Sequence, residues 1–275
     1  MRNIIGCKKV AVLHTHYSAR IKNMLQSFYN MSTLFHSDAN SYNGASSINI
    51  LEFLWVPKVR FSMKKIIFVD IPMKKMNDTT DTQCYAGTGN ADCRYTGKVV
   101  FPVNAVLAEK LQKGDQVKAV LLTTITGKDH SIENAELFQQ ELNSINAAIG
   151  AHIEYERLAT DFVESKASHE ARLRKMLPLM EEGAELYADI TFGQKTIPMV
   201  LMCAFHFAEK FFDADVKKII YGKVEFIKHA DGIAYPENPE LYDVTPLYYL
   251  NNLMGTMEAP NGTEALKALD AFFAL

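Results

Sequence analysis

Segments of strand length alternate with longer segments of helical period from Met63 onward. The strand-like segments are Lys64–Ile71, Gln116–Thr124, His152–Ala159, Glu185–Ile190 and Val216–Phe226. The helix-like segments carry apolar residues at helical spacing, some with a Ser cap or a Gly stop, and are Val103–Gly114, Ser131–Gly150, Ser165–Gly183 and Gly193–Phe212. Such alternation predicts parallel strands joined by right-handed crossovers. We therefore predict an α/β fold, a doubly wound, mainly parallel Rossmann-like sheet with helices on both faces.

The two ends of the chain depart from this pattern. Residues 1–62 are rich in Ser, Asn and His, and His36–Ile50 has turn composition with no sustained period. We interpret 1–62 as an upstream mis-start, with Met63 as the natural start, or as a poorly ordered tail. A genuine extension is the alternative, because Ile48–Phe61 could pack as a strand or short helix. After a Rossmann-like domain at 63–226, residues 227–275 predict a C-terminal hairpin and helical extension.

Composition restricts the partners. The 275 residues include 29 basic and 32 acidic side chains, a formal net charge of -3. Such a chain has no overall positive electrostatic field that would attract duplex nucleic acid or a membrane surface. A polyanionic ligand must therefore be held by a local site. The four cysteines are dispersed with no Cys-x-x-Cys pair, which argues against a zinc knuckle and fits a cytoplasmic location. We expect neither a metal nor a cofactor.

Ligands of doubly wound sheets bind outside the carboxyl ends of the strands, where the direction of the connections reverses. Four loops are predicted on that rim. They are Pro72–Pro102, Thr123–His130, Thr160–Glu164 and Thr191–Thr196.

The last of these loops has the composition of a phosphate-binding turn. Asp189 could accept backbone N–H bonds, and Gly193 would let the backbone approach a ligand. The amides of Gln194 to Thr196 would point outward from a helix N-terminus, which favours anions, and Lys195 would add a full charge. Thr191 and Thr196 would add hydroxyls. A purely architectural turn is the alternative, because any strand-to-helix turn needs a small residue and a cap.

Nicotinamide binding is a weaker interpretation. The stretch Gly87–Asp92, "GTGNAD", has two glycines of a G-x-G-x-x-G motif but lacks the third. It also lies within a long loop instead of opening a helix directly after a strand.

Several segments resemble the CRISPR-associated Rossmann-fold (CARF) domains of type III CRISPR systems. The most specific is "ADITFGQKTIPM", which is similar to the Asp-x-Thr-x-Gly-x-Lys/Arg motif that ends the fourth strand in that family. "YGKVEF" and "YDVTPLYYL" look like the family's fifth strand and the segment that follows it. "MKKIIFVDIPM", "YTGKVVFPVNAVLAEKL" and "VKAVLLTT" look like its first strand, first helix and second strand, so the resemblance covers about residues 63–250.

The resemblance implies a homodimeric sensor in antiviral defence that binds a cyclic oligoadenylate, with the tetra-adenylate as the family default. Carried over by position, one part of the ligand site begins at Ile71, Pro72 and Met73. The other is the turn made of Asp189, Thr191, Gly193, Gln194, Lys195 and Thr196. Thr123 and Thr124, at the end of the second strand, lie on the same rim and complete the expected ligand-binding set.

Two alternatives stay open. Some family members also cleave the ring, and in such a metal-independent ring nuclease Lys195 would be the catalytic residue. The family's usual small hydroxyl after the first strand is replaced here by Pro72, while Thr79 and Thr80 lie farther along. The second alternative is an unrelated Rossmann-like nucleotide-binding protein.

No effector domain is predicted in this chain. After Met63 no arginine is followed by a histidine at the spacing of the family's ribonuclease domains. We therefore expect a stand-alone sensor, a truncated effector, or a split subunit whose effector is a separate protein. The aromatic residues Phe205, Phe207, Phe211 and Phe212 fall at helical spacing and are predicted as core.

Overall fold

The computed structural model describes residues 64–274, so the predictions for 1–62, including the alternative start at Met63, lie outside the described residues. The strands are β1 (Lys64–Asp70), β2 (Gln116–Ile125), β3 (His152–Asp161), β4 (Glu185–Asp189), β5 (Asp215–Lys228) and β6 (Ala234–Asp243). The helices are α2 (Pro102–Lys110), α3 (Ser131–Asn146), α4 (Lys166–Met176), the 3₁₀ turn η1 (Leu177–Leu179), α5 (Ile197–Phe211), α6 (Thr245–Thr256) and α7 (Gly262–Phe273). Every strand and helix predicted after Met63 is confirmed in type.

The six strands form one sheet in the order β3-β2-β1-β4-β5-β6. Strands β1 to β5 are parallel, and β6 pairs antiparallel with β5. The chain winds outward from β1 through β2 to β3 and then returns to place β4 on the other side of β1. The topological switch point therefore lies between β1 and β4, and the predicted Rossmann-like fold is confirmed.

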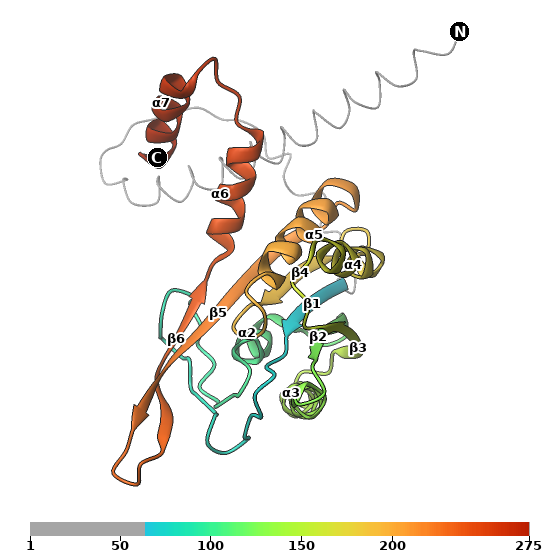
Figure 1. Ribbon diagram of the computed structural model, residues 1–275, viewed down its shortest axis with the longest axis vertical. Coiled ribbons are helices and arrows are strands. Elements are labelled where there is room, and N and C mark those ends of the chain that lie inside the picture. The colour runs from blue at the N-terminus through green and yellow to red at the C-terminus, as the bar shows by residue number, and fades with distance from the viewer. Residues whose placement is uncertain (1–63, 275) are drawn as a thin grey trace, which may run out of the picture. The chain divides into compact units, whose positions relative to one another are not determined.

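Both faces of the sheet are buried, which explains why residues 66–69 of β1 form a continuous apolar run. Ile67 and Val69 pack with helices α2 and α3 on one face. Ile66 and Phe68 pack with α4, α5 and the start of α6 on the other. Figure 1 shows α2 and α3 on one side of the strands and α4 and α5 on the opposite side.

Helix α5 begins later than predicted, at Ile197 instead of Gly193. Gly193 has a φ of +83°, which lies outside the helical region, and Pro198 stands in the first helical turn, where its fixed φ suits the start of a helix. The segment from Gly193 to Thr196 therefore forms a turn at the sheet rim, between β4 and α5, that is not part of the helix.

The predicted aromatic core of α5 is wrong in part. Phe205 is fully buried, but the side chain of Phe211 is 57% exposed. The ring of Phe207 lies 4.6 Å from that of Phe211 and 6.1 Å from that of Phe212. Only one stripe of a surface helix can face the sheet, so these three rings form a cluster at the partly exposed end of α5.

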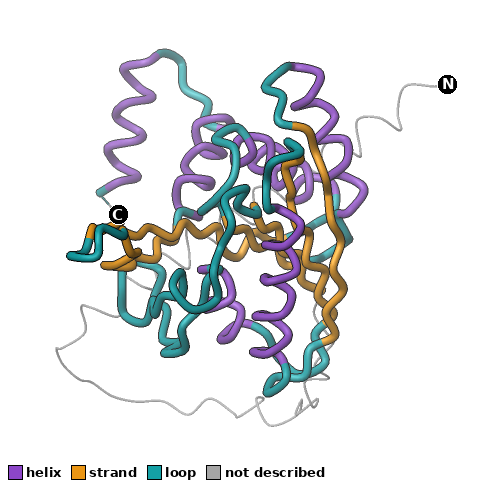
Figure 2. Tube along the Cα trace, turned by 60° about the horizontal axis from the view of Figure 1, so that its bottom comes forward, coloured by secondary structure: helices purple, strands orange, loops and turns teal. Residues whose placement is uncertain are grey.

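Strand β5 continues past the sheet as one arm of a hairpin. It pairs with β4 only as far as Ile220, and beyond that residue its ladder partner is β6 alone. The long loop of residues 71–101 lies beside this hairpin, as Figures 1 and 2 both show. Gln83 Nε2 donates to the carbonyl of Pro236 at 2.8 Å, so the loop is hydrogen-bonded to the hairpin.

The same loop covers β6 through the "GTGNAD" stretch. The amides of Asn90 and Ala91 donate to the carbonyl of Leu241 at 3.1 and 3.2 Å. A Cβ on Gly89 would lie 2.0 Å from that carbonyl oxygen, so this position requires a glycine. The glycines therefore serve a backbone contact that covers an edge strand, as such edges require.

The α/β unit extends to Gly255, and α7 belongs to a second unit that includes residues 256–275. Helix α7 is capped by Asn261, whose side-chain oxygen accepts from the amide of Glu264 at 3.1 Å. Among residues 64–274, none of the helices has the length and apolar character needed to cross a membrane.

Candidate functional site

The switch point places the ends of β1 and β4 side by side. Val69 is in register with Asp189, so Asp70 and Asp189 both stand at the carboxyl edge of the central strands. Both side chains are buried. Ligands of this fold class bind outside this edge, between the loops that leave these two strands.

Asp189 fixes the turn that follows β4. Its Oδ1 accepts from the amide of Thr191 at 2.9 Å, and its Oδ2 accepts from the amide of Val103, at the start of α2, at 3.1 Å. The hydroxyl of Thr191 in turn accepts from the amide of Gly222 in β5 at 2.8 Å. Asp189 and Thr191 therefore hold the turn to α2 and β5 and offer no free group to a ligand in this arrangement.

Gly193 lies against the carboxyl group of Asp70. A Cβ built on Gly193 would lie 2.0 Å from Asp70 Oδ1 and 2.1 Å from Oδ2. Neither oxygen of Asp70 has a hydrogen-bond partner among the described residues. The turn therefore comes down onto a buried carboxyl group, which is possible only because residue 193 has no side chain.

Burial raises the pKa values of both Asp70 and Asp189. Desolvation raises the pKa of Asp70 well above its usual value, the charge of Asp189 raises it further, and Arg172 opposes the shift. Desolvation also raises the pKa of Asp189 to about 6, against the hydrogen bonds from Thr191. The rim is therefore less negative than two ionised aspartates would make it.

The outer side of the turn presents unpaired donors. Lys195 is exposed and has no ion-pair partner in the described part of the chain. The amides of Gly193, Gln194, Lys195 and Thr196 find no acceptor among residues 64–274, whereas that of Ile197 donates to the carbonyl of Gln194 at 3.0 Å. Backbone amides and a cation before a helix N-terminus attract anions such as phosphate.

The side chain of Gln194 points inward. It is buried, its Oε1 accepts from Arg172 Nη2, and its Nε2 lies 3.5 Å from the hydroxyl of Thr124. The neighbouring Thr123 is buried and its hydroxyl has no partner among the described residues. Thr124 thus lies beneath the turn, whereas Thr123, the preceding residue of β2, points to the opposite face of the sheet. Only the backbone of Gln194 faces the outer side of the turn.

The start of the loop after β1 is held by Asn134 of α3. Asn134 Nδ2 donates to the carbonyls of Pro72 and Lys74 at 2.6 and 2.8 Å, and its Oδ1 accepts from the amide of Met76 at 3.0 Å. The carbonyl of Met73 accepts from the amide of His130 at 2.9 Å. Ile71 and Pro72 are buried and Met73 is half-buried, so these three predicted residues contribute mainly backbone to the rim.

Sequence reasoning missed Asp70, Asn134 and Arg172. The signal for Asp70 was available, because it is the single charged residue at the end of the apolar run "IIFVD". Asn134 and Arg172 lie within amphipathic helices among other polar residues, and nothing local distinguishes them from solvent-facing positions.

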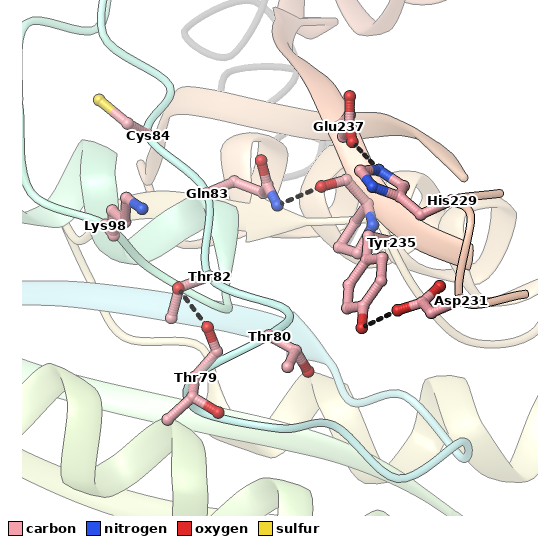
Figure 3. Close-up of a pocket in the computed structure, with 11 residues that line it drawn as sticks. Thr79, Thr80, Thr82, Gln83, Cys84, Lys98, His229, Asp231, Tyr235 and Glu237 are labelled. Atoms are coloured by element: carbon pink, nitrogen blue, oxygen red, sulfur yellow. Dashed lines mark hydrogen bonds and ion pairs between the residues drawn. The ribbon is translucent and has the colours of Figure 1, made fainter. Parts of the chain in front are cut away.

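A hollow with a volume of about 660 Å³ lies between the loop after β1 and the hairpin, and none of the residues of the β4–α5 turn lines it. Figure 3 shows Thr79, Thr80 and Lys98 facing His229 and Tyr235 across it. Tyr235 donates to Asp231 Oδ2 at 3.0 Å, and His229 pairs with Glu237. The hollow is polar, and both of its carboxylates already have partners, whereas Lys98 has no ion pair among residues 64–274.

Among residues 64–274 no group of three or more His, Cys, Asp or Glu side chains is arranged to hold a metal ion. Neither the known protein-family models nor the curated proteins searched contain a match to this chain. The family resemblance therefore rests on the motif residues, together with the Rossmann-like fold.

Proposed function

We propose that this chain is a sensor that binds a cyclic oligoadenylate as a homodimer, with the phosphates of the ring at the β4–α5 turn. The observation that carries the proposal is the position of that turn. It stands at the switch point beside β1, with Lys195 and the amides of residues 193–196 unpaired among the described residues. These are the donors that a phosphate needs.

Electrostatics support an anionic ligand at this place despite the net charge of -3. The raised pKa of Asp70 reduces the negative charge beneath the turn, whereas Asp189, with its pKa raised to about 6, stays largely ionised at neutral pH. A two-fold axis at the rim would bring two copies of Lys195 and two helix N-termini to one ring. A symmetric ring of phosphates matches such a pair of identical sites.

The biological setting follows from the resemblance to the CARF domains. We propose the tetra-adenylate as the ring, a role in type III CRISPR antiviral defence in the cytoplasm, and a separate effector protein as the partner that reads the bound state.

A ring nuclease is the second candidate. It is favoured by Lys195, whose charge could stabilise the transition state of phosphodiester cleavage. It is weakened by the buried Pro72 directly after β1, and by Thr79 and Thr80, which line the hollow beside the hairpin.

Calorimetric titration with linear and cyclic oligoadenylates, followed by chromatography of the recovered ligand, tests both candidates. Binding of one intact ring per two chains is the expected result. Recovery of linear product would establish the ring nuclease. No binding to any ring would overturn the proposal and leave a Rossmann-like protein for another nucleotide.

A further inference from the structure

Three polar side chains surround one carboxylate at the start of α5. Glu164, in the loop between β3 and α4, accepts from the hydroxyl of Thr196 at 2.6 Å. His169 Nε2 lies 2.7 Å from the same oxygen, and Arg172 Nη1 lies 3.9 Å from the other one. A hydroxyl, an imidazole and a guanidinium around one anionic group resemble the coordination of a bound anion.

The ion pair between Glu164 and Arg172 differs from an ordinary surface ion pair in the burial of its cation. The side chain of Arg172 is 1% exposed and that of Glu164 is 39% exposed, so a solvent-accessible carboxylate reaches a buried guanidinium. Arg172 is also anchored independently of Glu164, because its Nη2 donates to the carbonyl of Asp161 at 3.1 Å and to Gln194. Its Nε has no acceptor among the described residues. The cation would stay in place if the carboxylate left.

The hydroxyl of Thr196, at the start of α5, is also bonded to Glu164. Thr196 is the N-cap residue of α5, yet its hydroxyl makes no capping bond to that helix and donates to Glu164 instead. The hydrogen bond from Thr196 is the largest cause that lowers the pKa of Glu164, so the group stays ionised. A negative charge thus already lies beside the turn at which the anion is proposed to bind.

We infer that Glu164 is an internal competitor for the anionic ligand, since its carboxylate takes up the Thr196 hydroxyl and the Arg172 guanidinium that an entering phosphate would use. The inference rests on the proposed function. The Thr196 hydroxyl can donate its proton to the phosphate or to the Glu164 carboxylate, but not to both. A phosphate and a carboxylate that both contact Thr196 also repel each other, so ligand binding expels Glu164. Its release would remove the contacts of Glu164 with Thr196 and Arg172, one residue before the N-cap of α4, and this local change would report the bound ligand.

Glu164→Gln tests the competitor, with Glu170→Gln as the matched control. Glu170 is an exposed carboxylate on α4 that pairs with Lys166 at 3.6 Å, so the control removes the same charge nearby without touching Thr196. With cyclic tetra-adenylate as the probe, we expect Glu164→Gln to bind on the order of ten-fold more tightly than the wild type. Glu170→Gln should stay within about two-fold of the wild type. In a Thr196→Val background the gain from Glu164→Gln should shrink, because only the charge repulsion between Glu164 and the phosphate is then left to relieve.

The outcomes separate this inference from the proposed function. Equal or weaker binding by Glu164→Gln than by Glu170→Gln would overturn the competitor role, while ring binding by the wild type would leave the sensor proposal intact. Binding by Glu164→Gln alone would support a strong competitor. If no variant bound the ring, the sensor proposal would fail, and inorganic tripolyphosphate would decide the competitor role. Tighter tripolyphosphate binding by Glu164→Gln would support that role, and equal or absent binding would overturn it.

Discussion

The carboxyl group of Asp70 occupies the space that any side chain on Gly193 would need. Asp70 ends β1, Gly193 lies in the turn after β4, and the two meet because β1 and β4 are neighbours in the sheet. Gly193 therefore does more than provide a left-handed turn. It lets the backbone of the β4–α5 turn lie directly over a buried acid.

Gly193→Ala should be strongly destabilising. The methyl group meets the Asp70 carboxyl at 2.0 Å, and the φ of +83° is unfavourable for alanine. Left-handed strain contributes about 1–2 kcal/mol and overpacking a further 1–3 kcal/mol to the lost free energy of unfolding. Urea denaturation of both proteins measures the difference.

Gly183→Ala is the matched control for this substitution. Gly183 has a φ of +66°, but an added Cβ there has no neighbour within 4 Å, so only the strain term applies. Adding Asp70→Ala to Gly193→Ala should restore part of the loss by making room. Equal costs at positions 183 and 193 would show that Asp70 does not restrict residue 193.

Asp70→Asn should be more stable than the wild type at neutral pH. The folded-state pKa values of Asp70 and Asp189 lie above the unfolded value of about 3.9, so the folded chain retains these protons longer. Their contribution to stability is complete below about pH 4 and is lost as pH rises, through about 6 for Asp189 and through the raised pKa of Asp70. Each carboxyl gives a slope of about 1.4 kcal/mol per pH unit within its window.

Denaturation at a series of pH values between 4.5 and 7.5 measures how the free energy of unfolding depends on pH. Asp70→Asn should lose the part of this dependence that comes from Asp70. Asp78→Asn removes an exposed carboxyl and controls for net charge. Stability of Asp70→Asn that fell with pH as steeply as that of the wild type would mean that Asp70 is already ionised in the folded protein.

Lys195→Ala should weaken binding of a phosphate ring by about ten- to a hundred-fold, because it removes a charge-assisted contact worth about 1.5–3 kcal/mol. Lys195 is exposed, so the free energy of unfolding should change by less than about 0.5 kcal/mol. Lys113→Ala removes the same charge near the amino end of β2, at the opposite edge of the sheet, and should bind as the wild type does. Equal affinity of the two variants in calorimetry would place the ligand elsewhere.

Asn134→Ala should loosen the loop after β1. The buried side chain makes three hydrogen bonds to the backbone of residues 72–76, and their loss should cost about 2 kcal/mol or more. Hydrogen exchange of the Met76 amide should accelerate. Asn143→Ala, on the exposed side of α3, removes one hydrogen bond from Tyr155 and should leave that amide protected. Unchanged exchange in Asn134→Ala would mean that the loop is held by other contacts.

The order and type of the elements could be read from the chain because each depends on local periodicity. The stretch of residues 66–69 in β1 is apolar throughout because both faces of β1 are covered, by α2 and α3 on one side and α4 and α5 on the other. The position of the β4–α5 turn followed from the same reasoning, since parallel strands end at one edge. Side-chain directions did not follow, and the predicted core position of Phe211 is wrong because helical spacing does not show which stripe faces the sheet.

The sequence by itself determined a Rossmann-like alternation of strands and helices and a glycine and lysine turn after the fourth strand. Only the tertiary structure decided that Asp70 lies under Gly193, that Asn134 holds the first loop and that Arg172 and Glu164 meet at Thr196. These contacts join segments far apart in the chain. They depend on which strands are neighbours and on how helices pack across them, and no local pattern of residues encodes either one.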